Sequence, residues 1–338
     1  MDDDDIIGEL VVADTVTDIS TEVLDSLDED VMDNASASFA DGTRKVYGAH
    51  WRIFLKWCAG MKFDPLPTTP ETLARYATWL ANNKRKWSTI SVAMTTVNQA
   101  NVTSGHPDVR SAGLVQRVLR GIRRKLHVAP DQAAPFLGEH LKSGVAAFKP
   151  QTLMGLRDIA MLSCGFFGAF RRSELVGLNR GDFTLDSKGW IITLRKSKTD
   201  QEGRGRKVGL PYASNPAICP VRTVQAWFHA MDQAHPEVTP ETPAFLRIDN
   251  LHNKMLTERL TSQVLTRIVK QAAEQAGLDP ADFSAHSLRA GFVTSAVRAG
   301  KSVHAIRRQT GHNSLSMIDR YVRDATVFDD NAAIGLGL

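Results

Sequence analysis

Several side chains in the second half of the chain are of the types that phosphoryl transfer needs when no metal ion takes part. In sequence order they are Arg171 with Glu174, Lys198, His286 with Arg289, His312 and Tyr321. Two guanidinium groups can hold the non-bridging oxygens of a phosphodiester, on which negative charge develops in the transition state. A tyrosine hydroxyl can form a covalent phosphoester once a base has taken its proton, and a lysine can protonate the leaving oxygen.

Each of these residues also has an ordinary structural explanation when it is taken alone. Arg171 could close a salt bridge at a helix start, and His286 with Arg289 could cap a helix. Lys198, in a polar turn, could simply be solvated, and Tyr321 could be a partly buried aromatic residue. It is the combination, in this order, that favours a chemical role.

Other common catalytic patterns are missing from the sequence. It contains no Gly-x4-Gly-Lys-Ser/Thr phosphate loop, no His-Glu-x-x-His motif and no carboxylates paired at metal-binding spacing. The three cysteines, Cys58, Cys164 and Cys219, are too widely spaced for a metal-binding pattern or a disulfide framework. We therefore expect no metal and no cofactor, and a reducing location in the cytoplasm, associated with the nucleoid.

Charge is divided unevenly along the 338 residues, whose net charge is +4. Residues 1–41 contain 14 acidic and no basic residues, so the rest of the chain carries +18. A basic body favours a polyanionic partner such as nucleic acid, although a basic protein without such a partner would look the same. The acidic segment is predicted to be disordered, either as a solubilising tail or as a mimic of DNA. We expect no membrane span and no secretion signal.

Residues 42–126 have the periodicity of a small helical unit. The first helix begins near Thr43, and its predicted apolar face is formed by Tyr47, Trp51, Phe54, Leu55 and Cys58. Further helices are predicted to begin at Pro70, after a Thr69 cap, and to cover about 89–100 and 112–126, where Leu114 is expected to be buried. Three clusters of basic residues lie on or just ahead of these helices. Each could be a solvated helix face, but three in one unit favour a nucleic-acid surface.

Residues 127–135 are predicted to form a linker, and residues 136–338 a mixed domain. Its strands are predicted at 182–185, 190–195 and about 206–210, with the polar turn 196–205 closing a hairpin between the last two. Its helices are predicted at 152–167, from Arg172 onward, and at 220–234, 261–276, 287–299, 303–310 and 314–322.

In combination these motifs resemble those of the tyrosine recombinases, also called the phage integrase family. The first box of that family is similar to the run Phe170-Arg171-Arg172-Ser173-Glu174-Leu175. Its second box is similar to the set His286-x-x-Arg289, Gly311-His312 and, nine residues after His312, Tyr321. The resemblance extends over about residues 43–330. In architecture the chain is most similar to the Cre-like recombinases, which carry tryptophan where this chain has His312.

The resemblance implies how DNA would be cut. Tyr321 would attack the scissile phosphate and form a 3′-phosphotyrosine, which releases a 5′ hydroxyl. Lys198 would be the general acid to that leaving oxygen, and His286 would be the base toward Tyr321. Because the covalent bond conserves the phosphodiester energy, neither ATP nor a divalent metal would be required.

The resemblance also implies how the phosphate would be held. Arg171 and Arg289 would bind the non-bridging oxygens, and His312 would donate a hydrogen bond to the phosphate. Glu174, one helical turn from Arg171, would orient the site without contacting the phosphate itself. The expected DNA contacts, most of them to phosphates, come from Lys45, Arg52, Lys56, Lys86, Ser88, Thr89, Gln263 and Arg267.

The implied fold is mainly α. A helical-bundle N-terminal DNA-binding domain (42–126) would be joined to a mixed α/β catalytic domain (136–338) with a small antiparallel sheet. Together they would form a C-shaped clamp around double-stranded DNA. Two protomers would bind an inverted-repeat site as a homodimer, and two such sites would synapse in a homotetramer. The segment after Tyr321 would dock on a neighbouring protomer.

Two other functions are compatible with the same residues. A type IB topoisomerase uses similar chemistry as a monomer, but the compact helical N-terminal unit and a helix after Tyr321 favour a recombinase. A sequence-specific DNA-binding protein that has lost catalysis would have the same basic surface. The complete set of candidate catalytic residues argues against that loss.

Overall fold

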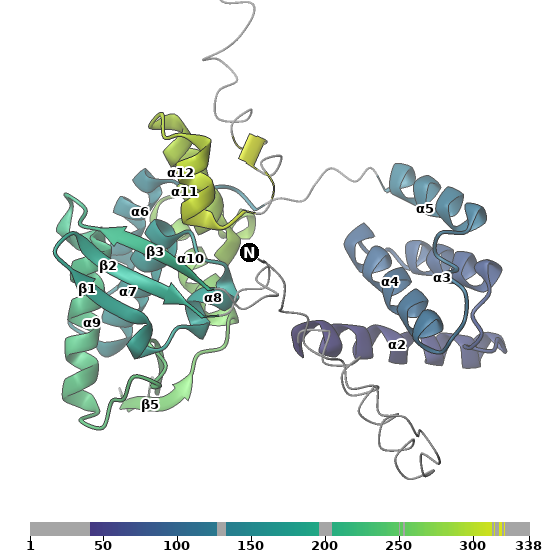
Figure 1. Ribbon diagram of the computed structural model, residues 1–338, viewed down its shortest axis with the longest axis horizontal. Coiled ribbons are helices and arrows are strands. Elements are labelled where there is room, and N and C mark those ends of the chain that lie inside the picture. The colour runs from purple at the N-terminus through teal and green to yellow at the C-terminus, as the bar shows by residue number, and fades with distance from the viewer. Residues whose placement is uncertain are drawn as a thin grey trace, which may run out of the picture. The chain divides into compact units, whose positions relative to one another are not determined.

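The computed structural model describes residues 41–126, 133–195, 205–249, 251–252, 254–312, 314, 318–319 and 321. Its contacts divide the chain into two compact units, residues 1–131 and 132–338, each with its own apolar core (Figure 1). Helices dominate the described part of both units, and its strands all lie in the second. The expected mainly α fold with a small antiparallel sheet is thereby confirmed. No helix in the described ranges is long and apolar enough to cross a membrane.

The first unit consists of four described helices. They are α2 (Asp41–Met61), α3 (Pro70–Asn82), α4 (Trp87–Thr103) and α5 (Gly113–Lys125). Thr69 caps α3 as predicted, because its side chain accepts a hydrogen bond from the Thr72 amide. In α2 the buried aromatic residue beside Phe54 is Trp57, whereas Leu55, expected in the core, is 37% exposed. The apolar face of α2 therefore includes Trp57 and excludes Leu55, so it is shifted around the helix relative to the predicted face.

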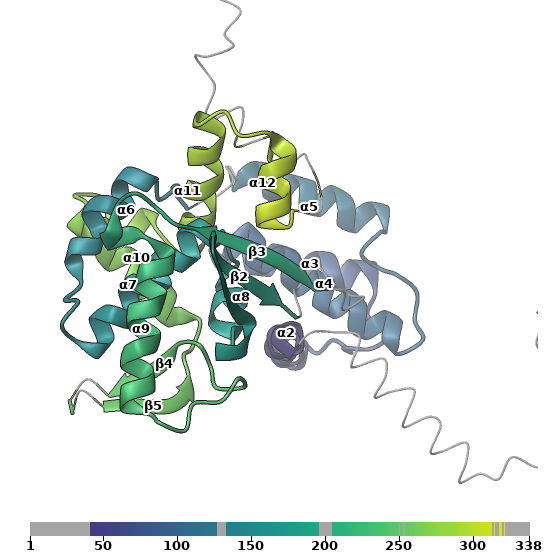
Figure 2. The same cartoon turned by 60° about the vertical axis from the view of Figure 1, so that its left-hand side comes forward.

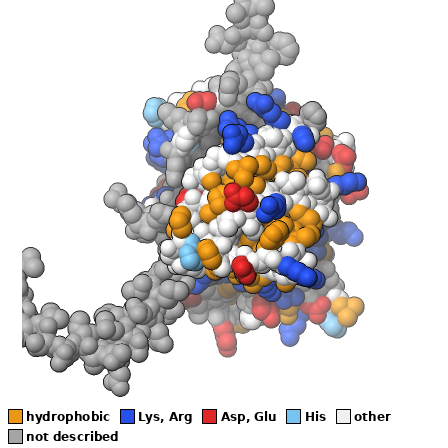
Figure 3. All heavy atoms as spheres, turned by 90° about the vertical axis from the view of Figure 1, so that its right-hand side faces the viewer, with side chains coloured by type: hydrophobic (Ala, Val, Ile, Leu, Met, Phe, Trp, Pro, Cys, Tyr) orange, Lys and Arg blue, Asp and Glu red, His pale blue; other side chains and the backbone are white. Residues whose placement is uncertain are grey.

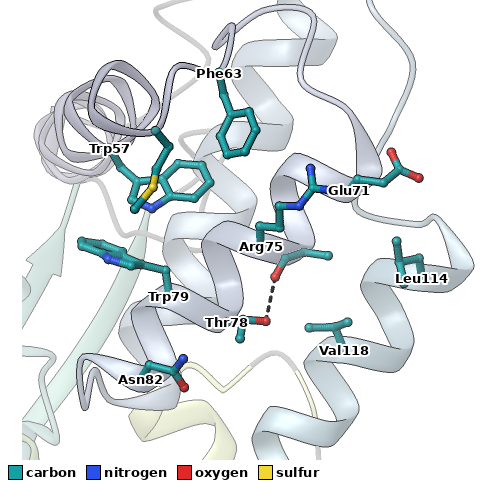
Figure 4. Close-up of a pocket in the computed structure, with 11 residues that line it drawn as sticks. Trp57, Phe63, Glu71, Arg75, Thr78, Trp79, Asn82, Leu114 and Val118 are labelled. Carbon is teal, nitrogen blue, oxygen red and sulfur yellow. Dashed lines mark hydrogen bonds between the residues drawn. The ribbon is translucent and has the colours of Figure 1, made fainter.

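A groove runs over the surface of this first unit, between α2, α3 and α5. Its volume is about 560 Å³, and its apolar wall includes Trp57, Phe63, Trp79, Leu114 and Val118 (Figure 4). Figure 3 views the molecule from this side and shows apolar side chains gathered around a few charged ones. Leu114 was predicted to be buried, but α5 turns its neighbour Val115 into the core instead.

The second unit surrounds a three-stranded antiparallel sheet with the order β1-β2-β3. Its strands are β1 (Phe183–Asp186), β2 (Gly189–Leu194) and β3 (Arg206–Pro211), and a separate hairpin is formed by β4 (Leu246–Asp249) and β5 (Lys254–Arg259). Its helices are α6 (Gly138–Gly144), α7 (Leu153–Gly168), α8 (Arg172–Gly177), α9 (Pro220–Ala234), α10 (Gln263–Gln275), α11 (Ala285–Arg298) and α12 (Val303–Thr310). Single 3-10 turns occur at 145–147, 180–182, 216–218 and 280–282.

The core of this unit holds together the elements that carry the candidate residues. α7 is almost wholly buried, packs along α9 and contacts β3. α11 packs on α7, and Figure 2 shows α11 and α12 side by side next to β3. α11 also runs so close to Phe136 that a Cβ atom on Gly291 would lie 1.8 Å from the Phe136 carbonyl oxygen. The ends of α7, β3, α11 and α12 therefore share one rigid framework.

Several boundaries differ from the predicted ones. α11 begins at Ala285, so His286 lies inside its first turn, and α4 begins at Trp87, which places Ser88 and Thr89 in its first turn. The Ala134 amide already donates to Asp282 in the second unit, so the predicted linker ends before residue 135. The β4–β5 hairpin and α6 were not predicted. Of the helix predicted at 314–322, residues 318–319 and 321 are described and helical.

All three cysteines are free and lie in the two cores. Cys58 belongs to the core of the first unit, and Cys164 and Cys219 belong to that of the second. Burial raises the pKa of the Cys58 and Cys164 thiols. These residues therefore act as small apolar side chains in packing.

Candidate active site

Arg171 is placed by the sharp turn between α7 and α8. Ala169 ends α7 in the left-handed conformation, with φ of 47°, and Arg171 then serves as the N-cap of α8. The turn is tight, since a Cβ atom on Gly168 would lie 2.0 Å from the ring of Phe170. The turn brings the Arg171 side chain to the end of α12, where its Nη2 donates to the Gly311 carbonyl at 3.3 Å.

Glu174 is the buried carboxylate of the site, with its side chain only 2% exposed. Its Oε1 accepts from Nη1 of Arg171 at 2.6 Å, and its Oε2 accepts from the Arg171 amide at 2.9 Å. The second bond also caps α8, because a side chain three residues into a helix can reach back to the N-cap amide. Glu174 therefore holds Arg171 through both of its carboxylate oxygens.

Arg289 lies on α11 with only 2% of its surface exposed. Its Nη1 donates to the carbonyl oxygens of Ala169 at 2.7 Å and Thr310 at 2.6 Å, which joins the ends of α7 and α12. Burial, followed by the nearby charge of Arg171, lowers its pKa to about 10, so it is still a cation at neutral pH. Its Nη2 is buried and makes no hydrogen bond within the described ranges.

His312 follows the C-cap of α12 and is 8% exposed. Its Nδ1 lies 2.8 Å from the hydroxyl of Thr310, and that hydroxyl donates to the Ile306 carbonyl at 2.8 Å. Since Thr310 has one proton to give, its oxygen accepts from Nδ1–H, and the neutral ring leaves Nε2 unprotonated. Burial and the charges of Arg289 and Arg171 are the main causes that lower the His312 pKa to about 3.

His286 and Tyr321 reach the site from two neighbouring segments. His286 lies on the first turn of α11. Burial lowers the pKa of its imidazole, and the positive charges of Arg289 and Arg171 lower it further. Tyr321 is half-buried and packs on the small apolar cluster of Val293, Ile306 and Ile318, between α11 and α12. Its phenolic oxygen is close enough to Arg289 to affect the pKa of that group.

Lys198 lies outside the described residues, which stop at residue 195 and resume at 205. The two strands on either side of it are described. β2 and β3 pair antiparallel, with Leu194 opposite Arg206 at the open end. The predicted hairpin between these strands is thereby confirmed, while the position of Lys198 within it stays a prediction.

Two residues of this site were not among the predicted ones. Arg206, at the start of β3, donates from Nη2 to Oε2 of Glu174 at 3.2 Å, and Thr310 binds His312 as described above. The strand pattern offered a signal for Arg206, because it shares a strand face with the buried Val208 and Leu210. For Thr310 the signal is weaker, since a threonine near a helix end is common.

Positive charge dominates the assembled site. Three guanidinium groups, those of Arg171, Arg206 and Arg289, surround the single carboxylate of Glu174. With both histidines neutral, the described side chains leave an excess of about two positive charges. Such a site in a poorly solvated setting is suited to an anion with several oxygens. In the described ranges, no three His, Cys, Asp or Glu side chains come together as metal ligands would.

The predicted DNA contacts all lie at surfaces or helix starts of their own units. Lys45, Arg52 and Lys56 are exposed and follow one face of α2, seven and four residues apart. Lys86 is the N-cap of α4, Ser88 is exposed and Thr89 is half-buried in its first turn. Gln263 and Arg267 are exposed one turn apart on α10. These placements are compatible with the predicted contacts and leave them predictions.

Sequence comparison places known relatives over most of the chain. The model of the phage integrase family matches residues 145–326. An integrase/recombinase XerD homologue of Selenomonas ruminantium is 36% identical over 298 residues, which is 87% of this chain and 85% of that protein. Tyrosine recombinase XerD of Neisseria meningitidis is 30% identical over 184 residues, or 54% of this chain and 56% of that protein.

Solved structures of similar fold show the same arrangement of elements. A Tn1549 transposon integrase in complex with transposon right-end DNA has a TM-score of 0.60 and 17% identity, over 86% of this chain and 93% of that one. A lambda integrase dimer bound to a COC′ core site has a TM-score of 0.57 and 16% identity, over 89% and 95%. At sequence identities of 16% and 17%, the structural similarity establishes the fold of this chain and nothing further.

Proposed function

Because the chain belongs to the phage integrase family and is a tyrosine recombinase, we propose that Tyr321 forms a transient 3′-phosphotyrosine with duplex DNA. The phenolic oxygen attacks the phosphorus, the bond to the 5′ oxygen breaks, and the cut strand ends in a 5′ hydroxyl. Attack by the 5′ hydroxyl of another strand then releases Tyr321 and rejoins the DNA. The number of phosphodiester bonds is conserved, so the cycle consumes no nucleotide.

The observation that supports this proposal best is the buried Nη2 of Arg289, which has no hydrogen-bond partner among the described residues. A buried N–H group without a partner costs about 1–3 kcal/mol, and this one lies beside the further cation of Arg171. A non-bridging phosphate oxygen accepts from both guanidinium groups and balances their charge. The same contacts strengthen as charge develops on the phosphate, which lowers the barrier to cleavage.

The two histidines are neutral in the DNA-free protein, and this suits their proposed roles. Because the pKa of His286 is lowered, its ring is free to accept the proton of Tyr321 as that oxygen attacks. His312 requires a second proton, on Nε2, before it can donate to the phosphate, and the negative charge of bound DNA favours that protonation. Lys198 then protonates the departing 5′ oxygen.

Double-stranded DNA is the proposed partner. Two proteins of similar fold have been solved with DNA, one of them as a dimer on its site. We propose that two protomers bind an inverted repeat through the α2, α4 and α10 residues named above, and that two such sites synapse in a tetramer. The basic balance of the chain after residue 41 supports contacts to phosphates.

Covalent capture tests the proposal. The protein and its Tyr321→Phe variant are each mixed with fragmented DNA of the source organism, denatured with detergent, and the protein-linked DNA is sequenced. We expect wild type alone to enrich an inverted repeat, while the variant binds the same DNA without linking to it. Linkage without strand exchange between two copies of the site would instead support a topoisomerase.

Equal capture by the two proteins would contradict the assignment of Tyr321 as the nucleophile. Capture by neither, on a site that both bind in a gel-shift assay, would support a binding protein without catalysis. Addition of a chelator to the wild-type reaction serves as a control. Cleavage is expected to continue, because the proposed chemistry needs no divalent ion.

A further inference from the structure

Arg206 is an unusual residue for the first position of a strand. The described positions of β3 alternate, so that Arg206 points to the same side as Val208 and Leu210, which are 1% exposed. The Arg206 side chain is 19% exposed, and burial lowers its pKa. A buried guanidinium is retained only where it has partners, so its contacts indicate what it does.

Those contacts tie together three elements around the phosphate site. Nη2 of Arg206 donates to Oε2 of Glu174 at 3.2 Å, and Nη1 donates to the Gln309 carbonyl at 2.6 Å. The guanidinium also packs flat against Gly311, where a Cβ atom would lie 2.9 Å from its Nε. Arg206 thus contacts both the carboxylate that orients Arg171 and the turn that precedes His312.

The chain around Gln309 strengthens this connection. The Gln309 side-chain amide donates to the carbonyl oxygens of Phe167 at 2.9 Å and Gly209 at 3.0 Å. One residue therefore joins α12 to the end of α7 and to β3, while its own carbonyl receives Arg206. Arg206 and the Gln309 side chain therefore hold the end of α12 in addition to the bonds from Arg171 and Arg289.

We propose that Arg206 is a positioning residue that keeps the guanidinium of Arg171 available to the phosphate. A free glutamate and an arginine form a two-point pair in which both carboxylate oxygens take guanidinium N–H groups. Here Oε2 of Glu174 accepts from Arg206 and from the Arg171 amide, so the guanidinium of Arg171 contacts the carboxylate through Nη1 alone. Nη2 of Arg171 also donates to the Gly311 carbonyl, and the N–H groups that then remain on the guanidinium are left for an anion.

Arg206 also adds to the positive potential at His312. The titratable groups that face this ring are Arg289 and His286 from α11, Arg171 from the start of α8, and Arg206 from β3, and all of them lower its pKa. The loss of one cation removes part of that effect. This inference depends on the proposed phosphotyrosine chemistry, because only an anion in the site makes the freedom of Arg171 useful.

The test compares Arg206→Gln and Arg206→Lys with Arg259→Gln as a matched control. Arg259 donates to the carbonyl oxygens of Val176 and Leu178 and to the Asn179 side chain. It therefore holds the C-terminal end of α8, whereas Arg171 lies at the N-terminal end of that helix. DNA affinity, the single-turnover rate of covalent capture between pH 5 and 9, and thermal unfolding are measured for each protein.

We expect both Arg206 variants to slow capture about 10- to 100-fold, as small misplacements of catalytic groups do, with DNA affinity nearly unchanged. In Arg206→Gln the limb of the pH–rate profile that reports His312 moves to higher pH, whereas in Arg206→Lys the retained charge leaves it in place. We expect Arg259→Gln to capture DNA at the wild-type rate when the rate is calculated per folded molecule. If Arg206→Gln does not fold, the rate of covalent capture by Arg206→Lys alone tests the inference.

Wild-type rates in the Arg206 variants would overturn the inference, as would losses that match the folded fraction with an unmoved pH profile. Failure of the proposed function looks different, because the wild-type protein itself would then form no covalent adduct. The two results are therefore distinguishable in the same experiment.

Discussion

His312 shows how the surroundings of one side chain set its protonation. It is buried, faces several cations and donates a hydrogen bond from Nδ1–H to the Thr310 hydroxyl. In the unfolded chain a histidine takes up a proton below about pH 6.5, whereas the folded protein keeps His312 neutral down to about pH 3. The unfolded state therefore binds more protons between these two values, and stability falls as the pH falls through this window.

We predict that His312→Asn weakens this dependence. Between pH 6 and 4, the free energy of unfolding of the wild type should fall by up to ~1.4 kcal/mol more per pH unit than that of the variant. Urea unfolding at several pH values measures the difference. Above pH 7 the two curves should run parallel, and parallel curves at pH 4 to 6 as well would show that His312 titrates normally.

At the scale of single elements, two glycines in helices have opposite surroundings. Gly291 in α11 has the Phe136 carbonyl oxygen where a side chain would go, whereas Gly121 in α5 has nothing within 4 Å of that position. We predict that Gly291→Ala destabilises the protein by about 1–3 kcal/mol, because α11 must move. Gly121→Ala should stabilise it by about 0.5–1 kcal/mol, because alanine loses less backbone entropy in a helix.

Chemical denaturation of the two glycine variants checks this pair, with circular dichroism as the signal. Because α11 carries His286 and Arg289, the destabilised variant should also capture DNA more slowly. A Gly291→Ala protein as stable as the wild type would mean that α11 and the segment at Phe136 lie farther apart than described.

Helices of the catalytic unit were predictable wherever they bury one face or carry clear caps. The β4–β5 hairpin was missed because its strands have few buried positions and their register shifts between Leu246 and Ile248.

Buried positions on α2 and α5 were misassigned because helical spacing alone does not fix which residues face inward. A spacing of four residues fits the same helix face as a spacing of three, and only tertiary packing decides that Trp57 rather than Leu55 faces inward.

The candidate site was predictable to the extent that its residues occur in recognisable motifs. Arg171, Glu174 and Arg289 come together in the structure as the resemblance implied. The strand position of Arg206 indicated that it faces inward, but not its partners Glu174 and Gln309, which are distant in sequence. Thr310 lies two residues from His312, but a threonine near a helix end is too common to single it out. The finer resemblance to Cre-like recombinases and the C-shaped clamp stay predictions.

At the scale of the whole molecule, the division of charge has a measurable consequence. Removal of residues 1–40 takes away 13 acidic residues and changes the net charge from +4 to +17. α2 begins at Asp41, so the cut leaves every described helix whole. We predict tighter binding of non-specific duplex DNA at ~50 mM salt, with the difference fading near ~0.5 M, where charges are screened within a few ångströms.

Fluorescence anisotropy of the full-length and shortened proteins on one labelled duplex, over a salt series, measures this difference. A large gain at low salt would favour an acidic segment that competes with DNA, and a gain of two-fold or less would favour a solubilising tail. Equal affinities at every salt concentration would show that the acidic charge has no influence on the binding surface.

The burial of every cysteine makes the natural chain a convenient starting point for site-directed labelling. Maleimides and alkylating reagents need an accessible thiolate, and none of Cys58, Cys164 and Cys219 provides one in the native state. A cysteine introduced at exposed Asn82 on α3 or Glu274 on α10 would then be the residue that the fluorophore labels, while the native cysteines stay unlabelled. Paired dyes on the two units would report, in real time, whether the distance between the units changes when DNA is added.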